Sequence, residues 1–334
     1  MLINTVTGPI DTAALGPTLM HEHITCADWG MRMNLGNWYL KFDELVEIAA
    51  AMFSKAKQEC GVTTVVDATP INLGRDVKLI YEVAKRSGVN FIVSSGFYYQ
   101  EEITLMAPPP EGESGTSPGI NLLARPEDEI AELLLNECQN GIADTGIFPG
   151  MMKCAVGDAG ITPMIRRILS AVARVCAKTG LPVFCHHTVD SKNGGDILDI
   201  FESQGVALNR FILGHSGDTD DLAYLEQTLK RGCYLGMDRF AYCAMTAPSL
   251  EIRAATIAAL CQKGYENKLL ISHDNVGYGG FVGNWYDFKN SGPHDDAFTF
   301  VHKTALPALL AAGVTRKQFD TMIEDNPRRF FEGI

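Results

Sequence analysis

The stretch PTLMHEHITC, residues 17–26, places two histidines one residue apart at the end of a short apolar run. Alternate residues of a β-strand point to the same face, so His21 and His23 would converge on one point. A single histidine on an apolar face is usually a core residue. Two converging imidazoles instead suit a metal ion, and the pair therefore predicts part of a metal site whose other ligands lie elsewhere in the chain.

The composition is that of a folded, acidic protein. The 334 residues are 46% hydrophobic and 20% charged, with a formal net charge of −12. This charge, with no dense basic run, argues against nucleic acid or an anionic membrane as a partner and leaves a small-molecule substrate. No apolar run reaches the roughly 20 residues of a membrane span, and the N-terminus lacks the features of a signal peptide. Nine cysteines without CxxC spacing favour reduced thiols and a cytoplasmic location.

Eight short apolar runs alternate with helical patterns along most of the chain. They are residues 18–23, 63–69, 91–96, 150–156, 182–187, 211–216, 233–238 and 269–274. Such runs are typical of parallel strands buried on both faces. Eight strand–helix units predict an α/β fold, a single TIM (β/α)8 barrel over residues 1–334. The alternative is an open doubly wound sheet, but no GxGxxG motif follows the first strand.

Signals at helix ends support this pattern. Thr162, Pro163 and Gly180 are the expected N-cap, first-turn and C-cap residues of one helix.

Two segments interrupt the alternation of strands and helices. Residues 107–120 are rich in proline, glycine and serine and predict irregular structure. Residues 277–297 form a long glycine-rich stretch after the eighth strand, where barrel active sites lie, and predict a lid.

Polar residues interrupt the apolar strands, mostly near the carboxyl ends, where a barrel brings side chains of different strands together. The candidates are His21, His23, Lys153, His186, His215 and Asp274. Because one ion needs three or four protein ligands, six candidates predict two metal ions about 3.5–4 Å apart. Imidazole and carboxylate ligands without cysteine suit zinc, with cobalt, manganese or iron as alternatives. Lysine can join such a site only if it is deprotonated or converted into an anionic group.

Each candidate also has a structural explanation. Lys153 can extend its ammonium group to the barrel mouth. His215 or Asp274 can cap the segment that follows, and Asp218 or Thr219 is expected to begin the helix after His215. The same polar pattern on five strands favours one metal site over several separate explanations.

The spacing of these strands resembles the phosphotriesterase family of the amidohydrolase superfamily, and within it the phosphotriesterase-like lactonase branch. The likeness covers nearly the whole chain. It includes TLMHEHI (18–24), GMMKCAV (150–156), GLPVFCHHT (180–188), GHSGDTDD (214–221), LLISHDN (269–275) and NPRRFF (326–331).

The resemblance implies a role for each ligand candidate. It assigns His21, His23 and Asp274 to the more buried ion, His186 and His215 to the more exposed ion, and a carboxylated Lys153 to the bridge between them. Water between the ions would be the nucleophile, and Asp274 would take its proton and pass it outward through Asp218. His187 follows His186 directly, and by alternation only one of the two, expected to be His186, faces the interior.

Three further residues are expected to contact the substrate. Tyr98 and Arg239 fall where the lactonase branch is similar in carrying tyrosine and arginine, whereas strict phosphotriesterases carry tryptophan and histidine. Trp285 is expected on the wall of the substrate pocket. The alternatives are simple wall packing for Tyr98 and an ion pair with a nearby acid such as Asp238 for Arg239.

The resemblance therefore implies an enzyme that opens lactones, such as N-acyl homoserine lactones or other γ/δ-lactones, with promiscuous phosphotriesterase activity and a homodimeric state. The alternative enzymatic function is hydrolysis of another ester, a phosphotriester or an amide in the same site. A non-catalytic binding protein on a retained barrel would lack a ligand, and none of the six is missing.

Overall fold

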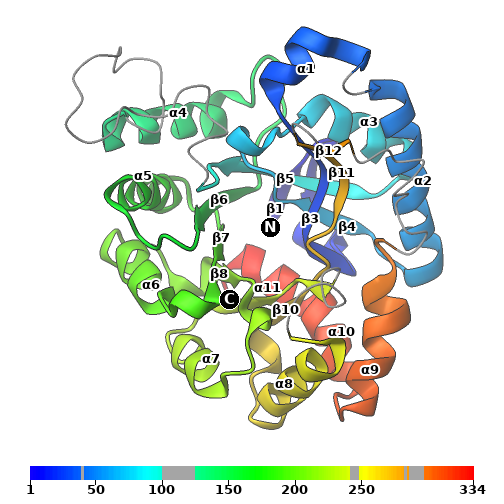
Figure 1. Cartoon of the computed structure of the whole chain (residues 1–334), viewed down its shortest axis with the longest axis vertical. Helices are drawn as coiled ribbons and strands as arrows, with labels where there is room; N and C mark the ends of the chain where they lie inside the picture. The colour runs from blue at the N-terminus through cyan, green and yellow to red at the C-terminus, as the bar shows by residue number, and fades with distance from the viewer. Residues whose placement is uncertain (39–40, 100–124, 241–247, 282–283, 286–296) are drawn as a thin grey trace.

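The computed structural model describes residues 1–38, 41–99, 125–240, 248–281, 284–285 and 297–334. Its main sheet confirms the eight predicted strands, which pair in parallel in chain order. They are β3 (Thr18–Ala27), β4 (Thr64–Asp67), β5 (Asn90–Gly96), β6 (Met151–Val156), β7 (Val183–His187), β8 (Phe211–Gly214), β9 (Tyr234–Met237) and β10 (Leu269–Ile271). The sheet curls into a barrel (Figure 1), as predicted.

The segment after β10 closes the barrel. It forms β11 (Val276–Phe281), which pairs in parallel with β3 and places Val276 opposite His23; the antiparallel β12 (Asn284–Trp285) follows. The prediction of a lid over residues 277–297 is therefore wrong for its first part. A Cβ atom at Gly277 would lie 2.8 Å from the carbonyl oxygen of Ile24, so glycine here permits close strand pairing. Residues 286–296 and the predicted irregular segment 107–120 lie outside the described residues.

Helices surround the sheet (Figure 1). They are α1 (Trp29–Leu35), α2 (Phe42–Cys60), α3 (Val77–Ser87), α4 (Glu127–Asn140), α5 (Pro163–Thr179), α6 (Gly194–Ser203), α7 (Leu222–Leu229), α8 (Leu250–Gln262), α9 (Leu306–Ala311), α10 (Arg316–Asp320) and α11 (Asn326–Glu332). The Thr162 side chain caps α5 as predicted, and Gly180 ends it with a φ of 73°. Among the described residues, no helix combines the length and apolar character that a membrane crossing needs.

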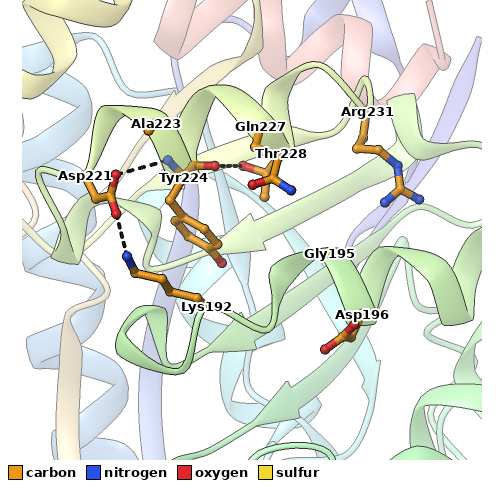
Figure 2. Close-up of a pocket in the computed structure, with 9 residues that line it drawn as sticks. All are labelled: Lys192, Gly195, Asp196, Asp221, Ala223, Tyr224, Gln227, Thr228 and Arg231. Carbon is orange, nitrogen blue, oxygen red and sulfur yellow. Dashed lines mark hydrogen bonds and ion pairs between the residues drawn. The ribbon is translucent and has the colours of Figure 1, made fainter.

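The helix after His215 begins later than predicted. Asp221 caps α7 by accepting a hydrogen bond from the Tyr224 backbone N–H, and it also pairs with Lys192 (Figure 2). These residues line a pocket of about 430 Å³ formed by residues of α6, α7 and the adjoining loops. Asp218, which was expected at the helix start, instead forms ion pairs with Arg239 and Arg253.

Apolar side chains fill the amino-terminal part of the barrel. Met20, Ile92, Phe184 and Tyr234 pack together there with Phe330 of α11. An antiparallel hairpin of β1 (Leu2–Thr5) and β2 (Gly8–Asp11), which the sequence did not predict, contributes to the same cluster. This packing leaves the carboxyl ends of the strands for the polar residues.

Glu22, between the two histidines, holds the closing segment to β3. Its buried carboxylate accepts hydrogen bonds from the Ser272 hydroxyl (2.7 Å), from the His273 backbone N–H (2.9 Å) and Nδ1–H (2.6 Å), and from the Asn275 backbone N–H (3.0 Å). His273 Nε2 accepts a hydrogen bond from the Val301 backbone N–H. His273 is therefore a neutral structural histidine, and Glu22 links the first strand to the junction between β10 and β11.

We expect Glu22→Ala to lower the free energy of unfolding by about 3–5 kcal/mol, because several buried donors lose their acceptor at once. Denaturant unfolding at pH 7 measures this change. The matched control is Glu59→Ala, which removes a partly exposed carboxylate paired with Lys303 and should cost at most about 1 kcal/mol. A similarly small effect for Glu22→Ala would contradict its role in closure.

Candidate metal centre

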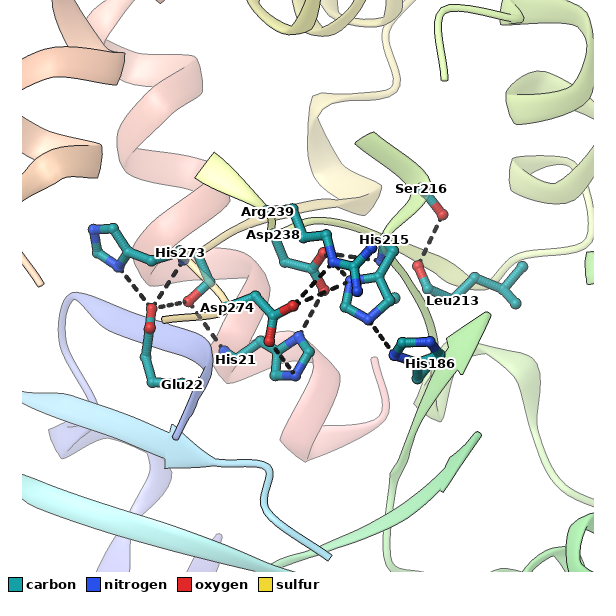
Figure 3. A network of polar contacts seen from close by, with 12 residues as sticks. His21, Glu22, His186, Leu213, His215, Ser216, Asp238, Arg239, His273 and Asp274 are labelled. Atoms are coloured by element: carbon teal, nitrogen blue, oxygen red, sulfur yellow. Dashed lines mark hydrogen bonds and ion pairs between the residues drawn. The ribbon is translucent and has the colours of Figure 1, made fainter. Parts of the chain in front are cut away.

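The first group of predicted ligands lies where β3 meets the closing segment (Figure 3). His21 Nε2 is 3.2 Å from both His23 Nε2 and Asp274 Oδ1, and His23 Nε2 is 3.3 Å from Asp274 Oδ1. All three residues are buried. Ligand atoms bound to zinc at about 2.0–2.2 Å in tetrahedral geometry lie about 3.3 Å apart. The three atoms therefore fit one face of a metal coordination shell.

Hydrogen bonds orient these imidazoles toward the shared point. His21 Nδ1 is 3.0 Å from Asp238 Oδ2, and His23 Nδ1 is 2.8 Å from Thr69 Oγ1. Burial lowers the pKa of His21 to about 3, so this imidazole is neutral, with its proton on Nδ1 and a lone pair on Nε2. A lone pair and a carboxylate oxygen that face each other repel unless a cation lies between them. The chemistry of this donor set therefore fits a divalent metal ion.

His186 and His215 form the second group. His186 Nδ1 lies 2.6 Å from His215 Nε2, and burial lowers the pKa of His186 well below its usual value. His186 faces the barrel interior, as predicted. Its neighbour His187 faces the helices, where its Nδ1 contacts the Gly214 carbonyl and its Nε2 contacts the Tyr224 hydroxyl.

Asp238, which sequence analysis named only as a possible partner of Arg239, is a further residue of the site. Its Oδ2 contacts His21 Nδ1, while its Oδ1 accepts hydrogen bonds from the His215 backbone N–H at 2.9 Å and Nδ1–H at 3.1 Å. One carboxylate thus orients a histidine from each ligand group. Burial alone would raise the pKa of Asp238, but the interactions with His215 and His21, including a hydrogen bond from each, outweigh burial and lower the pKa below its usual value. Its position directly after β9 follows the same strand-end pattern as the ligands.

Lys153 of β6 lies inside the site and does not extend to the barrel mouth. Its Nζ atom is 3.2 Å from His21 Nε2 and 4.0 Å from the centre of the Phe184 ring, and only 1% of its surface is exposed. Burial lowers the pKa of Lys153 to about 8, against the opposing charges of Asp274 and Asp238. The neutral form of this amine is therefore more populated near neutral pH than it is in an exposed lysine.

Arg239 connects Asp274 to Asp218. Its Nε donates to Asp274 Oδ2 at 3.0 Å, and its Nη1 donates to Asp218 Oδ2 at 2.8 Å. Arg239 thus forms ion pairs with two nearby acids, Asp218 and Asp274, as the alternative to a substrate contact predicted. The His215 side chain makes no capping hydrogen bond. His215 and Asp274 have positive φ values, 61° and 55°, as do Ala143 and Lys192 outside the site, and this conformation is disfavoured for residues other than glycine.

A pocket of about 390 Å³ opens over these groups. The residues that line it are His21, His23, Cys26, Leu73, Tyr98, Lys153, His186, Arg239, Asp274 and Val276. The Tyr98 ring packs edge-to-face on His186, with ring centres 5.0 Å apart, and burial raises the pKa of its hydroxyl well above the usual value. Sequence analysis did not identify Cys26, Leu73 or Val276. The backbone of Trp285 lies in β12, but its side chain lies outside the described residues.

Known proteins are similar to this chain in both sequence and fold. The model of the phosphotriesterase family matches residues 1–331. The chain belongs to the phosphotriesterase family. It is 35% identical over 339 residues to the phosphotriesterase homology protein of Mycobacterium tuberculosis, an alignment that covers 99% of this chain and 97% of that protein. The solved structure of the phosphotriesterase from M. tuberculosis matches with a TM-score of 0.84 at 34% identity, covering 99% and 98% of the two chains.

A more distant relative is also similar along its length. The aryldialkylphosphatase of Saccharolobus solfataricus is 26% identical over 322 residues, which are 96% of each chain. Two buried sets of side chains that share His21 could hold a metal ion: His21, His23 and Asp274, and His21, His215 and Asp238. Together with membership in this family, they make the chain a metal-dependent hydrolase.

We expect Asp238→Asn to weaken zinc binding by about 10- to 100-fold, because partners of ligand histidines set ring orientation and basicity. Competition with a chromophoric chelator measures the affinity. Asp199→Asn is the control, since Asp199 is an exposed carboxylate paired with Arg231. Equal affinities in the two variants would show that Asp238 does not orient the ligands.

Proposed function

We propose that this phosphotriesterase-family chain is a binuclear metal hydrolase that opens lactones, with phosphotriester hydrolysis as a promiscuous activity. The observation that carries the proposal is the charge balance of the pocket. Among the described lining residues, the cations are Lys153 and Arg239, and Arg239 is paired with two carboxylates. Apart from the two ions, such a pocket suits an uncharged substrate, a lactone or a phosphotriester, whereas an anionic phosphate monoester favours a further cation that is available to it; the Tyr98 side chain on the pocket wall supports the lactone of the two uncharged classes.

The ligand groups would hold two divalent ions, zinc in the first instance, with cobalt, manganese or iron as alternatives. The ions would occupy the sites of His21, His23 and Asp274 and of His186 and His215. When bound, they supply a water of lowered pKa and draw electron density from the substrate carbonyl.

Lys153 would bridge the two ions as a carbamate. Its amine nitrogen adds to the carbon of carbon dioxide and releases one proton, which yields an anionic carboxylate. The buried position of Lys153 and its lowered pKa support this step, because only the neutral amine reacts.

The remaining residues of the pocket would orient the substrate and move protons. The Tyr98 hydroxyl, which belongs to a residue of the pocket wall, would support the leaving alkoxide of the ring. Asp274 would accept the proton of the attacking water. Arg239 lies between Asp274 and Asp218 and does not lose its own proton in proteins. Transfer from Asp274 toward Asp218 would therefore pass through water along this ion pair.

The second candidate is hydrolysis of a phosphotriester, another ester or an amide in the same site. The specific support for a phosphotriester is the similarity to the aryldialkylphosphatase over 96% of both chains.

We expect the metal-loaded protein to hydrolyse its best neutral acylamino-lactone with a kcat/KM at least about tenfold above that for an aryl dialkyl phosphate. A tenfold ratio corresponds to about 1.4 kcal/mol of transition-state stabilisation. A phosphorylated lactone should be the poorest substrate. Proton release in weak buffer measures all three. A chelator should abolish activity, and zinc, cobalt or manganese should restore it. A higher value for the triester would reverse the order of the two candidates.

We expect ¹³C-labelled bicarbonate to give a carbamate carbon signal by NMR in the zinc-loaded protein. Lys153→Met should lack the signal, because it has no amine. Lys57→Met, which removes an exposed lysine bonded to the Gly88 carbonyl, should retain it. Identical spectra for the two variants would refute carboxylation of Lys153.

A further inference from the structure

Arg253 of α8 is a charged side chain buried almost completely, with 2% of its surface exposed. Its Nε donates to the Pro248 carbonyl at 3.0 Å, its Nη1 donates to the Gly217 carbonyl at 2.8 Å, and its Nη2 lies 2.8 Å from Asp218 Oδ1. Burying a guanidinium costs several kcal/mol unless such partners satisfy it. The guanidinium thus makes two hydrogen bonds to carbonyls and one ion pair without hydrogen-bond alignment, and lysine, with one ammonium group on a flexible stem, does not reproduce this set of contacts.

These contacts join the turn after β8 to Pro248 and α8. Gly217 and Asp218 come shortly after the ligand candidate His215, and Pro248 precedes α8. The fit around Gly217 is tight: a Cβ atom there would lie 3.3 Å from both Arg253 Nη1 and the Met237 Cα atom. Arg253 therefore packs directly against the turn that carries Asp218.

Charges of alternating sign form a row that ends at the candidate metal centre: Arg253, Asp218, Arg239 and Asp274. Asp218 uses Oδ1 for Arg253 and Oδ2 for Arg239, and Arg239 uses Nη1 for Asp218 and Nε for Asp274. The successive distances are 2.8, 2.8 and 3.0 Å. Asp274 keeps its other oxygen, Oδ1, in the triangle with His21 and His23. Figure 3 shows the inner end of this row, where Arg239 contacts Asp274.

We propose that Arg253 is a positioning residue of the metal centre. By holding Asp218, it fixes Arg239 against Asp274 and so sets the direction in which the Asp274 carboxylate presents Oδ1. Arg253 itself does not line the pocket among the described residues. Asp218 and Arg239 have side chains that are 18% and 29% exposed, so without Arg253 the pair can turn toward solvent and release Asp274 Oδ2. The kinetic part of this inference rests on the proposed function; the structural part does not.

A double-mutant cycle tests the proposal with Arg253→Met, Asp218→Asn and the combined variant. We expect Arg253→Met to lower kcat on the best substrate by about 10- to 100-fold, as is typical for partners of metal ligands, with little change in KM. In the Asp218→Asn background the same substitution should cost less than about threefold, because the two residues act through one contact. Arg253→Lys should retain part of the activity.

The cobalt(II)-loaded proteins provide a second readout that needs no substrate. Visible absorption bands of cobalt respond to ligand number and geometry, so Arg253→Met should change the spectrum only where Asp218 is intact. The matched control is Arg75→Met. Arg75 is also a buried arginine, bonded to the Glu137 carboxylate and the Ser94 carbonyl, and its loss should reduce stability while leaving kcat and the spectrum unchanged.

Equal effects of Arg253→Met in both backgrounds, or an unchanged cobalt spectrum, would overturn the proposal and leave Arg253 with a purely structural role. If Arg253→Met does not fold, the cycle is carried out with Arg253→Lys. If no lactone or triester is hydrolysed, the proposed function fails, and the spectra still decide whether Arg253 positions Asp274.

Discussion

A parallel barrel is complete only when its last strand pairs with its first, and in this chain that pairing depends on the buried carboxylate of Glu22. Four hydrogen bonds from residues 272–275 reach it. Because strand side chains alternate, the same three residues that place His21 and His23 inside the barrel place Glu22 on the opposite side. Closure also sets the ligand geometry: the Asp274 backbone N–H donates to the His21 carbonyl at 3.0 Å. Fold and metal centre thus depend on one tripeptide.

The charges around the centre are arranged in pairs that leave the ligand atoms available. Asp238 uses both oxygens on the far nitrogens of His21 and His215, so it orients ligands without occupying the point on which they converge. Asp274 divides its oxygens between Arg239 and the two histidines. Metal binding to such a preformed array adds to stability, because an unfolded chain offers no equivalent site.

The eight strands and the six ligand candidates could be predicted because both follow from local patterns, apolar runs and the polar residues near the ends of those runs. The fold then brings the candidates together at the carboxyl ends of the strands. The same pattern could not separate ligands from structural residues. His273 and Glu22 also lie at strand ends, but they bond to each other. It also missed contacts between elements distant in sequence, such as Asp238 with His21 and Arg253 with Asp218. The glycines of β11 suggested a loop, since composition does not show that Gly277 must approach the Ile24 carbonyl.

The two ligand positions with positive φ, His215 and Asp274, show how the fold compensates local strain. Each such conformation costs on the order of 1–3 kcal/mol and persists only when surrounding contacts determine it. At His215 those contacts are the two hydrogen bonds to Asp238; at Asp274 they are the backbone bond to His21 and the ion pair with Arg239. Both sets originate in neighbouring strands and the loops after them. The candidate ligands His215 and Asp274 are therefore held in strained positions by the closed barrel itself.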